Sequence, residues 1–209
     1  MLFVLTGDIQ SGKTRWLERI VEDLQRNGIT PYGVIAPGVW ADRRSNPSAF
    51  PHADANGFEK LGIDNVLLPE GKRITFALRT DLAENAGSFD SESQSARASL
   101  GWHISDEALQ QVNDHFARLA ARIASESTPG FVVVDELGRL ELECGGGLVE
   151  ALSLLEKGPY PACAHALVVV RSALLPLVDG HFDRWGETLF ARPDDDSRTA
   201  ILAAALDRR

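Results

Sequence analysis

The most constraining feature of this chain is an eight-residue glycine loop close to its N-terminus. Residues 7–14 read GDIQSGKT, which fits the pattern G-x-x-x-x-G-K-[ST]. The loop follows a short apolar run, Leu2 to Thr6, and precedes residues with helical spacing from Thr14 to Asn27. A buried strand, a glycine loop and an amphipathic helix in this order are the context that a phosphate-binding P-loop requires. The sequence therefore predicts a site for a nucleoside triphosphate.

The fixed residues of this loop each have a chemical role in phosphate binding. Its two glycines allow backbone angles that turn amide N–H groups toward the phosphates. Lys13 is expected to reach the β- and γ-phosphate oxygens and to assist catalysis, and the Thr14 hydroxyl is expected to be a ligand of Mg²⁺. The start of the following helix adds N–H groups and partial positive charge. The predicted phosphate-binding residues are Gly7, Asp8, Ile9, Gln10, Ser11, Gly12, Lys13 and Thr14.

A pair of acidic residues follows a second apolar run. Phe131 to Val134 is unbroken and apolar, and Asp135 and Glu136 come directly after it. Ligands of a doubly wound sheet bind outside the carboxyl ends of its strands. We therefore predict that Asp135 is the second Mg²⁺ residue and that Glu136 is the general base that activates water. Taken alone, the pair is equally consistent with the start of a solvated loop.

Apolar runs alternate with helical patterns along most of the chain. This alternation predicts an α/β fold with a mostly parallel sheet and helices on both of its faces. Ser105 is expected to cap a long helix that ends at about Ser125, and Ser197 to cap a last helix that ends at Leu206. The other expected strands are Tyr32–Trp40, Leu167–Val170 and Thr188–Phe190.

The middle of the chain has a different pattern. Short strand-like segments separated by turns predict an antiparallel hairpin or meander; they are residues 57–63, 66–68 and 73–79. We expect one domain over residues 1–209, with a β-rich insertion at about 32–80. Residues 84–101 are rich in Ser and Gly and are expected to form a flexible loop.

Composition limits the partners of this chain. Its 30 acidic and 21 basic residues give a net charge of -9, which disfavours binding to nucleic acid or to an anionic membrane surface. The two cysteines, Cys144 and Cys163, have neither disulfide-framework nor metal-site spacing. We expect reduced thiols in a cytoplasmic protein, because the N-terminus has no basic leader and no apolar run is long enough to span a membrane.

The acidic segment also carries a family resemblance. Residues 135–142, DELGRLEL, resemble the D-E-[IL]-G-[KR]-M-E-L signature of the small P-loop nucleoside-triphosphatases. That family includes thermostable archaeal and bacterial enzymes and the cancer-related nucleoside-triphosphatase. The resemblance implies a RecA-like core that hydrolyses ATP, GTP and other triphosphates to the diphosphate and phosphate with Mg²⁺. Arg139 stands at the basic position of the signature, so we predict that it stabilises charge on the transferred phosphoryl group.

Two other functions use the same loop and remain open. A kinase would transfer the phosphoryl group to a nucleotide or another small molecule, and a nucleotide-dependent switch or accessory protein would act on a protein partner. The Asp135–Glu136 pair favours hydrolysis, because a carboxylate beside the magnesium site suits the activation of water. Trp102 is expected in the core in preference to a position stacked on a base.

Overall fold

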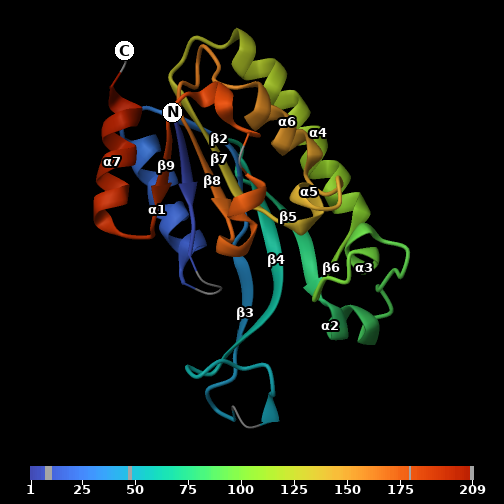
Figure 1. Cartoon of the computed structure of the whole chain (residues 1–209). Helices are drawn as coiled ribbons and strands as arrows, with labels where there is room; N and C mark the ends of the chain where they lie inside the picture. The colour runs from blue at the N-terminus through green and yellow to red at the C-terminus, as the bar shows by residue number, and fades with distance from the viewer. Residues whose placement is uncertain (8–10, 47–48, 179, 208–209) are drawn as a thin grey trace.

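One mixed sheet forms the centre of the molecule (Figure 1). The structure, a computed structural model, describes residues 1–7, 11–46, 49–178 and 180–207. In chain order the elements are β1 (Leu2–Leu5), α1 (Lys13–Arg26), β2 (Thr30–Ile35), β3 (Gly38–Asp42), β4 (Phe58–Leu68), β5 (Lys72–Arg79), α2 (Thr80–Asn85), α3 (Gln94–Arg97), β6 (Trp102–Ile104), α4 (Asp106–Ser125), β7 (Gly130–Leu137), α5 (Arg139–Leu142), α6 (Val149–Lys157), β8 (Ala166–Val170), η2 (Ser172–Leu177), η3 (Asp183–Trp185), β9 (Thr188–Ala191) and α7 (Asp195–Leu206).

The strand order divides the sheet into a parallel and an antiparallel part. Along the sheet the order is β6-β5-β4-β2-β7-β8-β1-β9, with β3 paired to β4. Strands β2, β7, β8, β1 and β9 run parallel, whereas β3, β4, β5 and β6 pair antiparallel on one side. The predicted α/β fold with a parallel sheet and an antiparallel addition is confirmed. The carboxyl ends of β1 and β7, where the glycine loop and Asp135 follow, therefore face the same edge.

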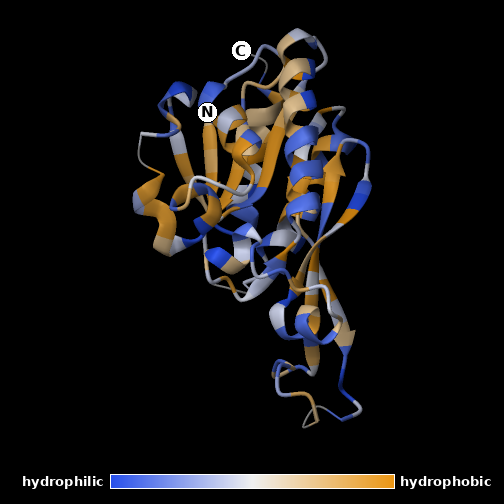
Figure 2. Ribbon diagram, turned by 90° about the vertical axis from the view of Figure 1, so that its right-hand side faces the viewer, coloured by the Kyte–Doolittle hydropathy of each residue, from blue (hydrophilic) through white to orange (hydrophobic). Residues whose placement is uncertain are grey.

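Helices cover both faces of the parallel strands, as the apolar runs predict. Alternate residues of β1 enter two separate cores: Phe3 and Leu5 pack with α1 and α7, whereas Leu2 and Val4 pack with α4 and α6. Figure 2 shows apolar strands inside and polar helix surfaces outside. A strand that is buried on both faces must be apolar at every position. None of the helices within the described ranges is long and apolar enough to span a bilayer.

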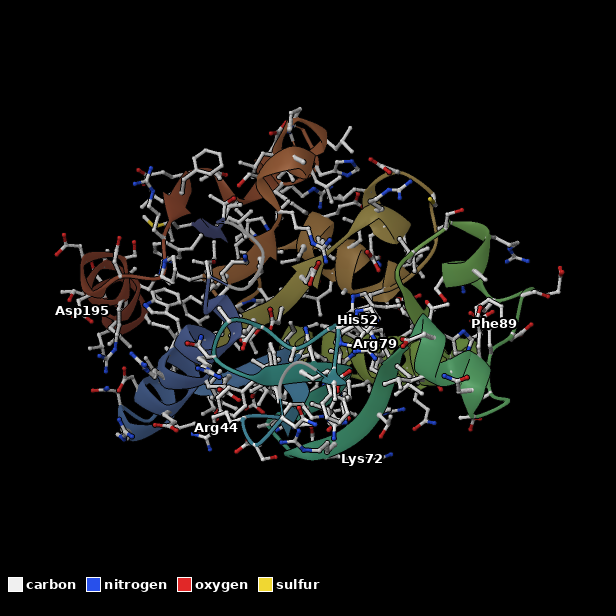
Figure 3. All side chains as sticks on the ribbon, turned by 90° about the horizontal axis from the view of Figure 1, so that it is seen from below. Arg44, His52, Lys72, Arg79, Phe89 and Asp195 are labelled. Carbon is white, nitrogen blue, oxygen red and sulfur yellow. The ribbon has the colours of Figure 1, made fainter. Side chains whose placement is uncertain are left out.

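The antiparallel part extends below the parallel strands as a hairpin of β3 and β4 (Figure 1). Its far end, next to the loop between β3 and β4, is stabilised by Glu59, which is buried and accepts hydrogen bonds from Arg43 at 2.8 Å and Arg79 at 2.9 Å. Arg79 also pairs with Asp81, which lies 3.8 Å from His52. In Figure 3 the labelled His52 and Arg79 lie side by side. The loop before β4 is thus tied to β5 by charges.

Several boundaries differ from those expected. Tyr32–Trp40 is two strands, because the chain leaves β2 at Ala36 and Pro37 before β3 begins. Segments 57–63 and 66–68 are one continuous strand, β4. The cap of α7 is Asp194, whose carboxylate accepts from the backbone N–H of Ser197, so the predicted Ser197 cap is wrong.

The segment 84–101 has more regular structure than its composition predicts. It contains the end of α2 and all of α3. Ser93 caps α3 and is buried, and Ser95 is fully buried and accepts from the backbone N–H of Ile104 at 2.9 Å. Serine in this segment therefore satisfies backbone groups inside the fold, a role that serine-rich composition does not reveal.

Candidate functional site

The segment predicted to be a P-loop comes between β1 and α1, at the carboxyl end of β1. Gly12 has φ of 83°, a left-handed conformation that favours glycine, and α1 begins at the next residue. The ammonium group of Lys13 donates to the carbonyl of Gly7 at 2.9 Å, so the side chain reaches back to the end of β1. Of the predicted phosphate-binding residues, Asp8, Ile9 and Gln10 lie outside the described residues.

Asp135 belongs to the acidic strand β7 and lies near the start of α1, the helix that follows the predicted P-loop. It lies near the end of β7, is buried, and accepts a hydrogen bond from the backbone N–H of Ala36 at 2.8 Å. The side chain of Thr14 lies near this carboxylate and acts to lower its pKa. Burial raises the pKa of Asp135 to about 6, and the charge of Glu136 adds to this rise. The two residues predicted to bind Mg²⁺ therefore lie near each other. Burial disfavours the anionic form of Asp135, so a positive charge bound at this place would stabilise that form.

Glu136 sits in a bulge of β7. Val134 pairs with Val168 and Leu137 with Val170, so β7 has one more residue than β8 between these two pairs. Glu136 has φ of 77°, a conformation that costs a residue other than glycine roughly 1–3 kcal/mol. The bulge breaks the alternation of side chains along β7. It thereby lets Asp135 and Glu136, which are consecutive, both line one cavity at this edge.

The partner of Glu136 is Arg171, which the sequence analysis did not select. Arg171 follows β8, and its guanidinium lies 2.5 Å from the carboxylate of Glu136. Arg139, the predicted arginine, instead pairs with Glu143 one helical turn away at 2.7 Å. Because β8 neighbours β7 in parallel, a residue just after β8 must lie near Glu136. The sequence does not show that β8 lies next to β7, and Arg171 could therefore not be selected from the sequence.

Lys60 was also missed, and it comes from the antiparallel part. Its ammonium lies 5.1 Å from the ring centroid of Trp102. Burial lowers the pKa of Lys60, while the negative charges of Glu136 and Asp135 act to raise it. Trp102 is half-buried beside this lysine and lines a cavity, so the predicted core position is wrong. We call Lys60, Asp135, Glu136 and Arg171 the charged wall of the site.

A buried carboxylate holds the loop that follows the charged wall. Glu141 accepts from the backbone N–H of Gly138 at 2.8 Å and from that of Leu148 at 2.7 Å, and burial raises its pKa. Gly147 has φ of 68°, and a Cβ there would lie 2.0 Å from Glu141 Oε1. Glycine is therefore required for this close approach. The backbone N–H of Gly147 also donates to Gln94 Oε1 at 2.9 Å, so this turn is fixed to α3.

The donor set near Thr14 and Asp135 suits a hard divalent cation. One hydroxyl and one carboxylate supply oxygen ligands, which Mg²⁺ prefers, and Mg²⁺ sites of this kind are completed by substrate phosphates and water. Among the described residues there is no group of three or more His, Cys, Asp or Glu that could hold a metal without such help. The residues present therefore fit a cation that arrives with a triphosphate.

The overall architecture is shared with two solved structures. A human cancer-related nucleoside triphosphatase has 16% identity and a TM-score of 0.61, with 99% of this chain and 98% of that chain covered. THEP1 from the hyperthermophile Aquifex aeolicus has 19% identity and a TM-score of 0.62, with 100% of both chains covered. No family model matches the sequence, and no curated protein matches it. Over its whole length, the chain has the fold of these two proteins.

Proposed function

We propose that this protein is a Mg²⁺-dependent nucleoside-triphosphatase that hydrolyses ATP, GTP and other triphosphates to the diphosphate and phosphate. The observation that carries the proposal is the proximity of Thr14, at the start of α1, to the carboxylate of Asp135 on β7, where Thr14 acts to lower the pKa of that carboxylate. The helix that follows the predicted P-loop thereby lies beside the strand that carries Asp135 and Glu136. A residue that would bind Mg²⁺ and a residue that would activate water share one edge of the sheet. The two triphosphatases with the same fold support this assignment.

Each residue has a defined task in this proposal. The backbone N–H groups of the loop and the ammonium of Lys13 bind the β- and γ-phosphates. Mg²⁺, when bound through Thr14 and Asp135, supplies positive charge that offsets the charge of the phosphates. Glu136 accepts a proton from a water molecule while the water oxygen bonds to the γ-phosphorus and the bond to the bridging oxygen breaks. The products are the nucleoside diphosphate and phosphate.

We assign the arginine of the site to Arg171 in preference to Arg139. Arg171 pairs with the proposed base, whereas the guanidinium of Arg139 pairs with Glu143. Both partners of the Arg171–Glu136 pair are roughly half exposed, and an exposed pair of this kind stabilises a fold by less than about 1 kcal/mol. A role in stability is therefore a weak reason for its position. Arg171 orients Glu136 and adds positive charge near the transferred phosphoryl group.

The test is phosphate release from ATP, GTP, CTP and UTP by the purified protein. Each nucleotide is assayed alone with Mg²⁺ and again with EDTA. We expect release without any acceptor, and its loss in EDTA. If release is negligible with all four nucleotides and appears only when a nucleoside or another acceptor is added, the protein is a kinase and the proposal is wrong. Nucleotide-dependent capture of a protein, without turnover, would instead indicate a switch.

A further inference from the structure

A lysine of the antiparallel part reaches back toward the parallel sheet. Lys60 pairs with Trp40 in the hairpin of β3 and β4, and this hairpin continues beyond the carboxyl end of β2 (Figure 1). A Cβ on Gly38 would lie only 2.9 Å from Lys60 Cε. Because Gly38 is the first residue of β3, the Lys60 side chain runs along the hairpin from Trp40 toward the end of β2. The side chain therefore points to the edge of the sheet where the acidic pair lies.

The charges that act on Lys60 come from β7 and from the turn after β8. Asp135 and Glu136 act to raise its pKa, and Arg171 acts to lower it. Since β4 and β8 lie on opposite sides of β7, the two cations flank the acidic pair from both sides. Arg171 forms an ion pair with Glu136, whereas Lys60 forms no ion pair with any of the described residues. Lys60 thus brings to the site a positive charge that no carboxylate contacts directly.

Trp102 holds the ammonium of Lys60 in place without neutralising it. The ammonium lies 5.1 Å from the centroid of the Trp102 ring, which is a cation–π contact. An aromatic face carries no net charge, so the charge of Lys60 stays available to an anion. Burial lowers the pKa of Lys60, because a half-buried ammonium loses part of its hydration. An anion bound at this place would supply the ion pair that the lysine lacks and would compensate for the lost hydration.

We propose that Lys60 is a second phosphate-binding lysine of the site, which contacts the γ-phosphate from the β4 side while Lys13 contacts it from the P-loop side. This rests on the proposed function only in treating the P-loop as the triphosphate site. Asp135 and Glu136 stand on β7, between β4 and β1 in the order of the sheet. The γ-phosphate is the end of the nucleotide that faces Glu136, so it is the part within reach of Lys60. There the ammonium stabilises negative charge on the transferred phosphoryl group.

The test compares a triphosphate with a diphosphate, so that it measures contact with the γ-phosphate directly. Lys60→Met keeps most of the length of the side chain and removes its charge. Isothermal titration calorimetry gives the affinities for a non-hydrolysable ATP analogue and for ADP, both with Mg²⁺. We expect Lys60→Met to weaken binding of the analogue by about tenfold or more, and to change ADP binding by less than about twofold, as the loss of one charge-assisted contact predicts. Phosphate release from ATP should fall by about 10²-fold.

Three further variants serve as controls. Lys72→Met changes an exposed lysine of β5 and should behave as the wild type in every measurement. Lys60→Arg keeps the positive charge and should retain most of the preference for the analogue over ADP. Gly38→Ala keeps Lys60 but displaces its side chain, because the new Cβ would lie 2.9 Å from Lys60 Cε. It should therefore weaken binding of the analogue and spare binding of ADP.

The outcomes separate this assignment from the proposed hydrolysis. The assignment is overturned if Lys60→Met binds the analogue as the wild type does, or if it loses affinity for ADP to the same extent. Unfolding of Lys60→Met at a clearly lower urea concentration than the wild type would overturn it as well, by showing that the charge supports the fold. If the wild type releases no phosphate and Lys60→Met loses affinity for the analogue alone, the proposed hydrolysis is wrong and the role of Lys60 stands.

Discussion

The two sides of the candidate site are built in different ways. The P-loop side is a contiguous segment in which Gly12 sets the backbone and Lys13 opens the helix. The charged wall combines residues of β4, β7 and the turn after β8, and its key residue Glu136 has a left-handed backbone that glycine would adopt more easily. Local sequence determines the first side, and strand order determines the second. Substitutions that affect one side and spare the other test this division.

The largest effect is expected at the P-loop. Lys13→Ala removes the cation that contacts the terminal phosphates, and turnover should fall by about 10²–10³-fold or more, with weaker triphosphate binding. The melting temperature should stay close to that of the wild type, because Lys13 is not part of either core. Lys72→Ala, an exposed lysine on β5 (Figure 3), is the matched control and should be neutral. Wild-type turnover in Lys13→Ala would remove the P-loop from the mechanism.

The proposed base gives the next largest effect and separates chemistry from binding. Glu136→Gln keeps the size of the side chain and removes its basicity, so phosphate release should fall by about 10²–10⁴-fold while the affinity for a non-hydrolysable triphosphate is retained. Glu143→Gln, on the adjacent helix, is the control and should remain active. Normal hydrolysis by Glu136→Gln would mean that another group activates water.

A second substitution at this position tests whether the strain belongs to function. Glu136→Gly should also be inactive, yet it relieves the left-handed backbone at φ of 77°. We expect a gain of about 1 kcal/mol in the free energy of unfolding, measured in urea. Glu136→Gln should show no such gain, because glutamine has the same backbone restriction. A glycine variant less stable than the glutamine variant would contradict the interpretation of strain.

The two arginines offer a smaller and more discriminating comparison. Arg171→Ala should lower phosphate release by about 10- to 100-fold, because it leaves Glu136 without its partner and removes positive charge near the γ-phosphate. Arg139→Ala should change release less than about threefold, since Arg139 forms an exposed ion pair with Glu143. Steady-state phosphate release with saturating Mg²⁺ measures both. A stronger effect at Arg139 would support the role in catalysis that the signature predicts for Arg139.

The same division explains what the sequence could predict. The P-loop, the apolar strand before Asp135 and the cap at Ser105, which accepts from the N–H of Ala108, all depend on neighbouring residues. Local rules for turns, caps and periodicity therefore found them. The failed Ser197 cap belongs to the same class, since Asp194 stands three residues earlier and also has a capping side chain. Both residues have side chains that can cap a helix, and local rules do not choose between them.

The missing half of the site depends on contacts that have no local signal. Lys60 reaches the charged wall only because β4 joins the parallel sheet beside β2. Arg171 reaches it because β8 lies next to β7 and the bulge turns Glu136 toward it. Neither strand order nor a bulge at a residue other than glycine can be read from periodicity. The signature octet marked the strand that carries Asp135 and Glu136, whereas Arg171, the arginine that pairs with Glu136, lies outside the octet.

The smallest expected effect concerns acid stability where the two parts of the sheet meet. His115 of α4 is buried, and its Nε2 donates to the carbonyl of Gly33 on β2 at 3.1 Å. Burial lowers the pKa of His115; Glu70, 3.9 Å from its Nδ1, acts to raise it and Arg118 to lower it further. The unfolded chain therefore takes up a proton first as the pH falls below about 6.5, and the folded state loses stability there.

His115→Gln removes this titration and serves as the comparison. Below pH 6.5 the wild type should lose stability faster than His115→Gln, by at most about 1.4 kcal/mol per pH unit, the slope for a single proton. Urea unfolding between pH 5 and pH 8 gives the two slopes. Hydrogen exchange should then show β2 and β4 losing protection before β1, because His115 contacts β2 and the turn after β4. Equal slopes for both proteins, or earlier exchange at β1, would place the acid-sensitive contact elsewhere in the sheet.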